Sequence, residues 1–214
     1  MDEADARSAL VAEARALDRD GLNHAATGNL SLRIGQLFLV TPSGIPARDL
    51  RPEDCVVIDA DGSPRDAGGP PPTSEWRLHV ELYRRPTVNA VVHTHSPEAT
   101  AAAVLGQPVP AVHYVVAKFG GSVLPCAPYA TYGTHELAAS VAATLGDRYR
   151  ACLMANHGGV AVAADLGTAA TLARDVEWVC GVWRRASQLG EPVVLDGAEI
   201  ERVATRLARY GQQA

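Results

Sequence analysis

The stretch Val88-Asn89-Ala90-Val91-Val92-His93-Thr94-His95 predicts a buried strand, because it is short and mostly apolar until its last three residues. Side chains alternate across a strand, so His93 and His95 project from one face while Thr94 points to the other. A single buried histidine is usually a hydrogen-bonded core residue. Two imidazoles side by side on an apolar strand are costly to bury unless something binds them, and a metal ion does so directly. The pair therefore favours a metal site.

A third ligand is found in Asn156-His157-Gly158-Gly159, where a short apolar strand over 151–155 ends at glycines. Alone, His157 is typical of a turn, but together with the pair it favours a three-histidine set, which is typical of a catalytic zinc with an open fourth position. Glu75 begins a predicted helix and is either an ordinary first-turn acid or a general acid/base beside the metal. The remaining histidines do not cluster and are expected at the surface or behind the ligands: His24, His79, His113 and His135.

Strands and helices interleave along the chain without a strict βαβ rhythm, which predicts a mixed α/β sheet flanked by helices in a single domain over residues 1–214. The positions of Gly and Pro and the spacing of apolar residues predict where each helix and strand begins and ends. Strands are predicted over 30–34, 37–41, 55–59, 88–95, 109–116, 151–155 and 160–163, and helices over 4–20, 74–83, 97–105, 134–145, 166–189 and 198–210.

Composition excludes several classes of function. The chain of 214 residues has 19 Lys and Arg against 24 Asp and Glu, a net charge of −5, which argues against a nucleic-acid-binding protein. No apolar run reaches the roughly 20 residues that a membrane span needs, and the acidic start does not resemble a secretion signal, so we expect a cytoplasmic protein with no membrane partner. Lys118 is the only lysine, which leaves a Schiff-base mechanism one candidate residue. The four cysteines form no CxxC pair and are expected to be buried free thiols.

Three small polar clusters form a second group: Thr27-Gly28-Asn29, Thr41-Pro42-Ser43-Gly44 and Thr73-Ser74. Each by itself is typical of a turn. Together they offer hydroxyls and backbone N–H groups near helix starts, an environment suited to a phosphate monoester. No Walker A loop or dinucleotide fingerprint is present, so nucleotide binding has little support.

The sequence resembles the class II aldolase/adducin family. The likeness rests on runs that occur in the family order and span nearly the whole chain. They are Gly21-Leu22-Asn23, Thr73-Ser74-Glu75-Trp76-Arg77, Ala90 to His95, Pro110-Ala111-Val112-His113-Tyr114, Gly120-Gly121, Pro125 to Gly133, Asn156-His157-Gly158 and Tyr210-Gly211.

The resemblance implies a zinc enzyme that reversibly cleaves a ketose 1-phosphate into dihydroxyacetone phosphate and a small aldehyde. The substrate would be similar to L-fuculose 1-phosphate or a 5-deoxypentulose 1-phosphate. It also implies a mixed α/β sandwich, with a mostly antiparallel central sheet, assembled as a homotetramer with sites at subunit interfaces.

The resemblance also assigns roles residue by residue. His93, His95 and His157 would bind one zinc ion per subunit, with Glu75 as a further ligand or as the acid/base. The phosphate-binding positions would be Gly28, Asn29, Ser43, Gly44, Thr73 and Ser74. Tyr114 would reach in from a neighbouring subunit and handle protons, and Tyr132 and Tyr210 would lie at the aldehyde end.

The chemistry agrees with these roles, because cleavage leaves an enediolate that needs an electron sink. A zinc ion chelated by the C2 and C3 oxygens is one such sink and a lysine imine is another, but only Lys118 could form the imine. Lys118, Asn156 and Leu207 stand where the most similar family members have a small residue, a histidine and an aromatic residue, so the identity of the aldehyde stays open.

Three alternatives remain within the family: a sugar-phosphate 4-epimerase, a methylthioribulose-1-phosphate dehydratase and a non-catalytic adducin-like scaffold. The epimerases have an aspartate at the position of Glu75 and a catalytic aspartate just before an Ile-Pro-Cys-like segment. Here that neighbourhood is Ser122-Val123-Leu124-Pro125-Cys126, which has no acid. A scaffold would have lost the metal ligands, whereas all four are present. The aldolase is therefore the favoured function.

Overall fold

The strand that carries the two histidines, β4 (Ala90–Thr94), is the middle strand of a seven-stranded sheet in the computed structural model, which describes residues 2–209. The sheet order is β3-β2-β1-β4-β9-β8-β7, and every neighbouring pair is antiparallel except β7 and β8. The other bounds are β1 (Asn29–Ile34), β2 (Leu37–Val40), β3 (Val56–Ile58), β7 (Cys126–Ala127), β8 (Ala151–Met154) and β9 (Gly158–Ala163). The expected mixed, mostly antiparallel sheet is confirmed.

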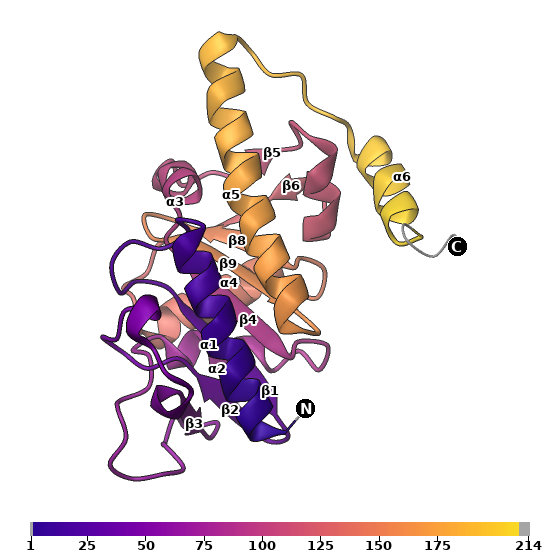
Figure 1. The fold of residues 1–214 in the computed structure, drawn as a ribbon. Coiled ribbons are helices and arrows are strands. Elements are labelled where there is room, and N and C mark those ends of the chain that lie inside the picture. Colours follow the sequence, from indigo (N-terminus) through magenta and orange to yellow (C-terminus); the bar gives the residue numbers. More distant parts are fainter. Residues whose placement is uncertain (1, 210–214) are drawn as a thin grey trace.

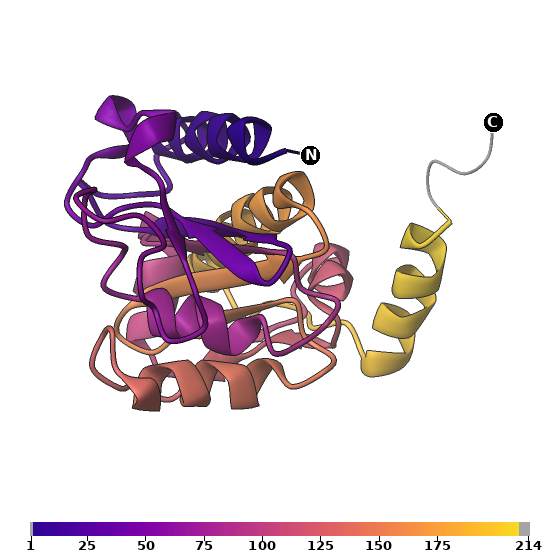
Figure 2. The same ribbon diagram turned by 90° about the horizontal axis from the view of Figure 1, so that it is seen from below.

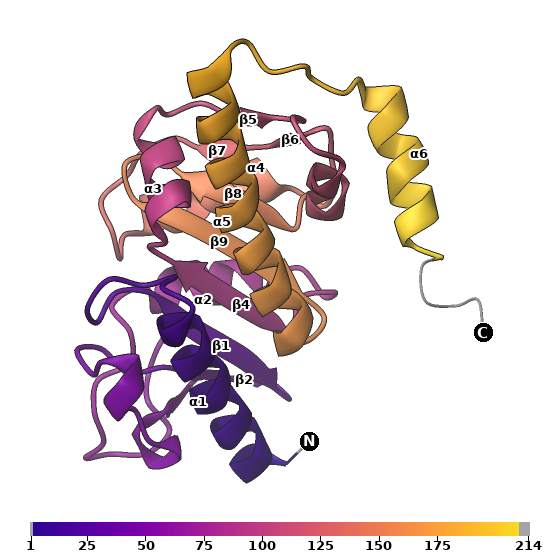
Figure 3. The ribbon, with the colours of Figure 1, turned by 45° about the horizontal axis from the view of Figure 1, so that its top comes forward.

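Helices cover both faces of this sheet (Figures 1 and 2). On one face lie α1 (Glu3–Arg19), α3 (Pro97–Val104) and α5 (Leu166–Leu189), and on the other lie α2 (Trp76–Leu82) and α4 (His135–Leu145). Figure 3 shows α1 and α5 lying across the same face. Burial on both faces explains why β4 is apolar at successive positions: Val91 packs toward α2 and α4, whereas Val92 packs toward the α1 and α5 layer.

The C-terminal helix α6 (Gly197–Leu207) stands apart from the sheet at the end of an extended connection (Figure 1). Of its residues only Ile200 is buried, and its principal contact is with the 3-10 helix η3 (Tyr114–Phe119). Tyr210, which the sequence places in this region, lies outside the described residues.

All six expected helices form, but the prediction of an extended segment over 109–116 is wrong for most of its length. Only Val109–Pro110 is a strand, β5, which pairs with β6 (Val123–Leu124) in a separate two-stranded ladder. The chain then turns into η3, because His113 Nδ1 accepts a hydrogen bond from the N–H of Val115 and Gly120 ends the helix at a φ of 93°. Two further 3-10 helices, η1 (Ala47–Asp49) and η2 (Pro52–Asp54), were also not expected.

Among the helices of residues 2–209, none combines the length and the apolar character that crossing a membrane requires.

Candidate metal centre and active site

The three histidines and the glutamate of the sequence analysis meet at one point, although they come from three separate parts of the chain. His93 and His95 stand at the end of β4, His157 lies in the turn between β8 and β9, and Glu75 immediately precedes α2. One ligand atom from each of the four residues lies within 4.8 Å of the ligand atoms of the others. The alternation along β4 therefore puts His93 and His95 on one side, as expected.

The atoms that face one another in this cluster are acceptors of hydrogen bonds. His93 Nδ1 donates to the carbonyl oxygen of Gly159 at 3.0 Å, so its Nε2 carries a lone pair in the neutral ring. That Nε2 lies 2.9 Å from His95 Nε2 and 3.1 Å from Glu75 Oε2. Glu75 Oε1 is buried, lies 3.4 Å from His157 Nε2 and accepts no hydrogen bond from the described residues. With His93 neutral, a cation between these atoms is what satisfies the converging lone pairs, so the donor set fits a divalent metal.

The electrostatics of the cluster keep two rings neutral and the carboxylate charged. Burial, together with the positive charge that His93 can carry, lowers the pKa of His95 to about 3 and that of His157 to about 4. Burial by itself would raise the pKa of Glu75, but His93, His157 and the Asn29 amide hold it well below its usual range. Burial opposes charge on His93 too, yet the neighbouring Glu75 carboxylate raises its pKa. Neutral His95 and His157 rings beside a carboxylate are the forms that bind a metal.

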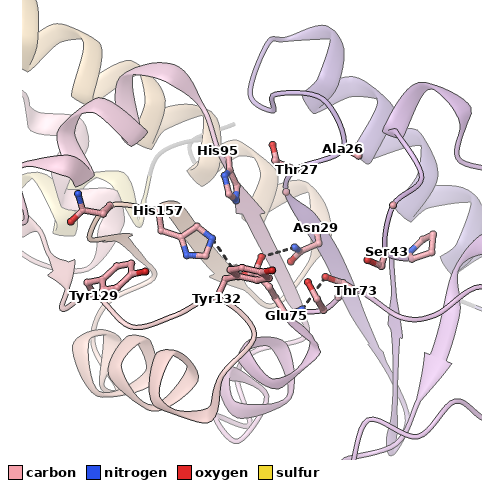
Figure 4. A pocket seen from close by; sticks show the side chains of 15 residues that line it. Ala26, Thr27, Asn29, Ser43, Thr73, Glu75, His95, Tyr129, Tyr132 and His157 are labelled. Carbon is pink, nitrogen blue, oxygen red and sulfur yellow. Dashed lines mark hydrogen bonds and ion pairs between the residues drawn. The ribbon is translucent and has the colours of Figure 1, made fainter.

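A cavity of about 360 Å³ opens beside the cluster, and three of the four candidate ligands line it (Figure 4). His93 is completely buried beneath them. All six residues assigned to phosphate binding also line this cavity: Gly28, Asn29, Ser43, Gly44, Thr73 and Ser74. The described residues that line it include no lysine or arginine, so hydroxyl, amide and backbone N–H groups are the donors available there.

Backbone hydrogen bonds join the three polar loops around the cavity. Thr73 donates its N–H to the carbonyl of Thr41 at 3.1 Å, and Thr41 Oγ1 accepts from the N–H of Leu30 beside the first loop. Only Thr73-Ser74 precedes a helix; the other two loops flank strands, which differs from the helix starts expected for all three. The loops meet because β1, β2 and the segment before α2 are neighbours in the sheet layer.

Two positions of the site require glycine because neighbouring atoms leave no room for a Cβ. Gly28 has a φ of 77°, and a Cβ there would lie 2.1 Å from Asn23 Oδ1. That Asn23 oxygen accepts a hydrogen bond from the N–H of His95 at 3.2 Å, so the loop packs directly on the end of β4. The likeness of Gly21-Leu22-Asn23 to the family was the sequence signal for Asn23, to which no role was assigned.

The second close approach, at Gly158, yields a test of how β9 positions the ligands. A Cβ at Gly158 would lie 2.3 Å from the backbone oxygen of Thr94, and only strand separation relieves such a contact. We expect Gly158→Ala to lower the free energy of unfolding by about 1–3 kcal/mol in urea titrations, and to weaken metal retention. Gly159→Ala is the matched control, because its Cβ would meet nothing closer than Val176 Cγ1 at 3.5 Å. Equal losses in the two variants would contradict this account.

Tyr114, assigned to proton transfer, and Tyr132, assigned to the aldehyde end, differ in placement. Tyr132 is exposed and lines the cavity, whereas Tyr114 is 49% exposed on η3 and is not among the residues that line it. Tyr129 and Asn156 also line the cavity, although the sequence analysis assigned no site role to either. Asn156 has a φ of 55°, a conformation that asparagine tolerates better than most residues. Lys118 pairs with Asp175 at 2.9 Å and does not line this cavity.

A mixed α/β sandwich with a three-histidine and glutamate cluster beside a small polar cavity matches a known class of protein. Residues 8–183 match the family described as class II aldolase and adducin N-terminal domain. The chain belongs to this family.

Several relatives and one solved structure with high similarity to the chain are named as aldolases. The chain is 45% identical over 209 residues to a 5-methylthioribulose-1-phosphate/5-deoxyribulose-1-phosphate aldolase of Rhodospirillum rubrum, covering 97% of this chain and 93% of the relative. It is 42% identical over 197 residues to an L-fuculose phosphate aldolase of Escherichia coli O6:H1, covering 91% and 90%. A solved L-fuculose 1-phosphate aldolase superposes with a TM-score of 0.90 at 37% identity, covering 95% of this chain and 96% of that one. The expected family, fold and class of enzyme are confirmed.

Proposed function

We propose that the protein is a zinc-dependent aldolase that reversibly cleaves a ketose 1-phosphate into dihydroxyacetone phosphate and a small aldehyde. The observation that carries the proposal is that the metal-ligand cluster and the glycine and hydroxyl loops line the same cavity. The relatives support it, since their names describe aldolases of sugar phosphates. Three imidazoles and a carboxylate are ligands typical of zinc.

His93, His95, His157 and Glu75 would hold the metal, and three of these residues line the cavity. A bound zinc ion supplies Lewis-acid stabilisation, worth several kcal/mol, for the negative charge that develops on the dihydroxyacetone phosphate half. The protein supplies rigid placement. His93 is fixed by its bond to Gly159, and the backbone of His95 is fixed by Asn23.

Cleavage of the C3–C4 bond removes one proton from the C4 hydroxyl and adds one at C3. In the direction of condensation, Glu75 is the carboxylate in the cavity that can take the proton from C3, because its Oε1 accepts no hydrogen bond from the described residues and its low pKa keeps it ionised. In the direction of cleavage the same carboxyl group, once protonated, gives that proton back to C3. Tyr114 is the group we assign to the proton at the aldehyde end.

The phosphate would bind at the opposite end of the cavity, against the loops at Gly28, Ser43 and Thr73. Backbone N–H groups at glycines of positive φ can surround an anion without a positively charged side chain. Because these donors are neutral, they suit a phosphate monoester. They do not favour a polyphosphate, whose larger negative charge usually requires positively charged side chains or metal ions.

The experiment that tests the proposal combines metal analysis with a substrate panel. Purified protein is assayed for zinc and then given L-fuculose 1-phosphate, 5-deoxyribulose 1-phosphate and 5-methylthioribulose 1-phosphate, with released dihydroxyacetone phosphate measured by coupled reduction. We expect zinc-dependent release from at least one of the three, lost on chelation and restored by zinc. Isomerisation or dehydration without release of dihydroxyacetone phosphate would instead favour the epimerase or the dehydratase.

We also propose that the protein acts as a homotetramer in which Tyr114 serves the site of a neighbouring subunit. The support is that Tyr114 is half exposed and does not line the cavity of its own chain. Its ring lies 4.3 Å from the ring of His113 at a tilt of 34°, and His113 in turn contacts Trp178 edge-on, so the tyrosine is part of an exposed aromatic surface. Such a surface is typical of a protein–protein contact.

Tyr114→Phe is expected to slow turnover by about 10²-fold, near the lower limit for loss of a proton-transfer group, while bound zinc is unchanged. Tyr149→Phe is the control, a half-buried tyrosine of the other face. Mixing Tyr114→Phe and His95→Ala subunits in one assembly tests the direction of the contact. Because one variant keeps the metal site and the other keeps the tyrosine, mixed assemblies should regain part of the activity. Unchanged turnover in Tyr114→Phe would remove the tyrosine from the mechanism.

A further inference from the structure

We propose that His79, a fully buried histidine with no direct contact to the cluster, is a positioning residue that orients Glu75 through the amide of Asn29. Four hydrogen bonds link Tyr83, Ser31, His79, Asn29 and Glu75 in an unbroken buried chain. Figure 4 shows its last bond, from Asn29 to Glu75. This chain, called the His79 relay below, leads from the metal cluster to the far end of α2.

The pattern of positions explains how the relay forms. Glu75, His79 and Tyr83 are spaced four residues apart and therefore share one side of α2 and its ends. Asn29 and Ser31 are spaced two residues apart and share one face of β1. Packing this side of α2 against that face of β1 lets each polar side chain meet its partner. Buried polar groups that all find partners make a rigid arrangement.

The direction of every bond in the relay follows once the Glu75 carboxylate is ionised and the His79 ring is neutral, the form that complete burial favours. An ionised carboxylate only accepts, so Asn29 Nδ2 donates to Glu75 Oε2 at 2.9 Å and Asn29 Oδ1 faces the other way. Asn29 Oδ1 only accepts, so His79 Nε2 carries the proton and donates to it at 2.5 Å. His79 Nδ1 then accepts from the hydroxyl of Ser31 at 2.6 Å. Ser31 Oγ in turn accepts from the hydroxyl of Tyr83 at 2.6 Å. All donors point toward Glu75.

The direction of these bonds fixes the orientation of the Asn29 amide. If the amide were flipped, its oxygen would face the carboxylate and its NH₂ would face the Nε2–H of His79. Oε2 of Glu75 is therefore held, whereas Oε1 accepts no hydrogen bond from residues 2–209 and faces the cluster near His157. The relay thus gives the two carboxylate oxygens different tasks, one fixed to the protein and one directed to the metal or the substrate.

The first test measures zinc affinity by competition with a chelator, using the full chain loaded with zinc. We expect His79→Leu to weaken zinc binding about 10- to 100-fold, the usual effect of losing a partner that orients a ligand. His79→Gln keeps an N–H at the Nε2 position and should recover most of that loss. Tyr83→Phe removes only the distant end of the relay and should cost less than about tenfold. Leu82→Ala is the control. Leu82 is a core residue of α2, so truncating it lowers the stability of the protein without touching the relay.

The same variants separate positioning from simple structural support. The inference rests on the proposed aldolase activity only for its prediction about turnover. There we expect kcat to fall in His79→Leu by a larger factor than KM changes. The zinc affinities stand whether or not any sugar phosphate is cleaved. A loss of affinity that is equal in His79→Leu, His79→Gln and Leu82→Ala would overturn the proposal, because it would follow stability alone.

The second test needs no variant and so does not depend on folding. In zinc-loaded protein with ¹⁵N-labelled histidine, long-range ¹H–¹⁵N spectra assign the protonated nitrogen of each ring. For His79 we expect a neutral ring with the proton on Nε2. A proton on Nδ1, or on both nitrogens, would reverse or break the relay and overturn the proposal.

Discussion

His95→Ala is expected to yield a folded protein that retains no zinc and has lost cleavage activity by at least about 10²–10³-fold. The loss follows from the several kcal/mol that a bound metal supplies to the developing negative charge, at 1.36 kcal/mol for each tenfold in rate. His95 is the sharpest position for this test, because its ring lines the cavity and its removal opens space to solvent more than to the core. Zinc content after dialysis and the coupled cleavage assay are the two measurements.

The control for this variant is His135→Ala, which removes an exposed imidazole at the start of α4, outside the metal cluster. It should retain both zinc and turnover. If His95→Ala kept its zinc, or lost it while cleaving at the normal rate, the three-histidine metal site would not be the centre of the chemistry.

The central sheet and the metal cluster were predictable because each depends on a local sequence pattern. Alternation along β4 determines that His93 and His95 share a side, and both faces of the strand are buried, so its apolar residues are consecutive. His157 was predictable from the glycines that follow it. These glycines let β9 approach β4 so closely that a Cβ at Gly158 has no room.

The features that the sequence alone did not predict depend on a local cap in one case and on contacts between distant segments in the others. The segment over 109–116 is apolar enough for a strand, but His113 and Gly120 cap a 3-10 helix instead. Tyr129 reaches the cavity from a loop whose path no local pattern determines. His79 was expected at the surface or behind the ligands. Its spacing of four from Glu75 and Tyr83 was the available signal, but its partners on β1 are about fifty residues away in the chain.

Glu75→Gln is expected to lower kcat by about 10²–10⁴-fold, the usual contribution of a positioned proton-transfer group. The substitution preserves shape, and the new side-chain oxygen can still accept the Asn29 hydrogen bond that now measures 2.9 Å. What disappears is the negative charge and with it the ability to take up a proton at pH 7. The three imidazoles remain, so zinc should bind, although more weakly because a negative ligand has been lost.

Glu136→Gln, which changes an exposed acid in the first turn of α4, is the matched control and should leave kcat unchanged. Measured at saturating substrate and excess zinc, a Glu75→Gln protein with normal kcat would mean that the carboxylate serves only to hold metal, and the proton at C3 would need another donor.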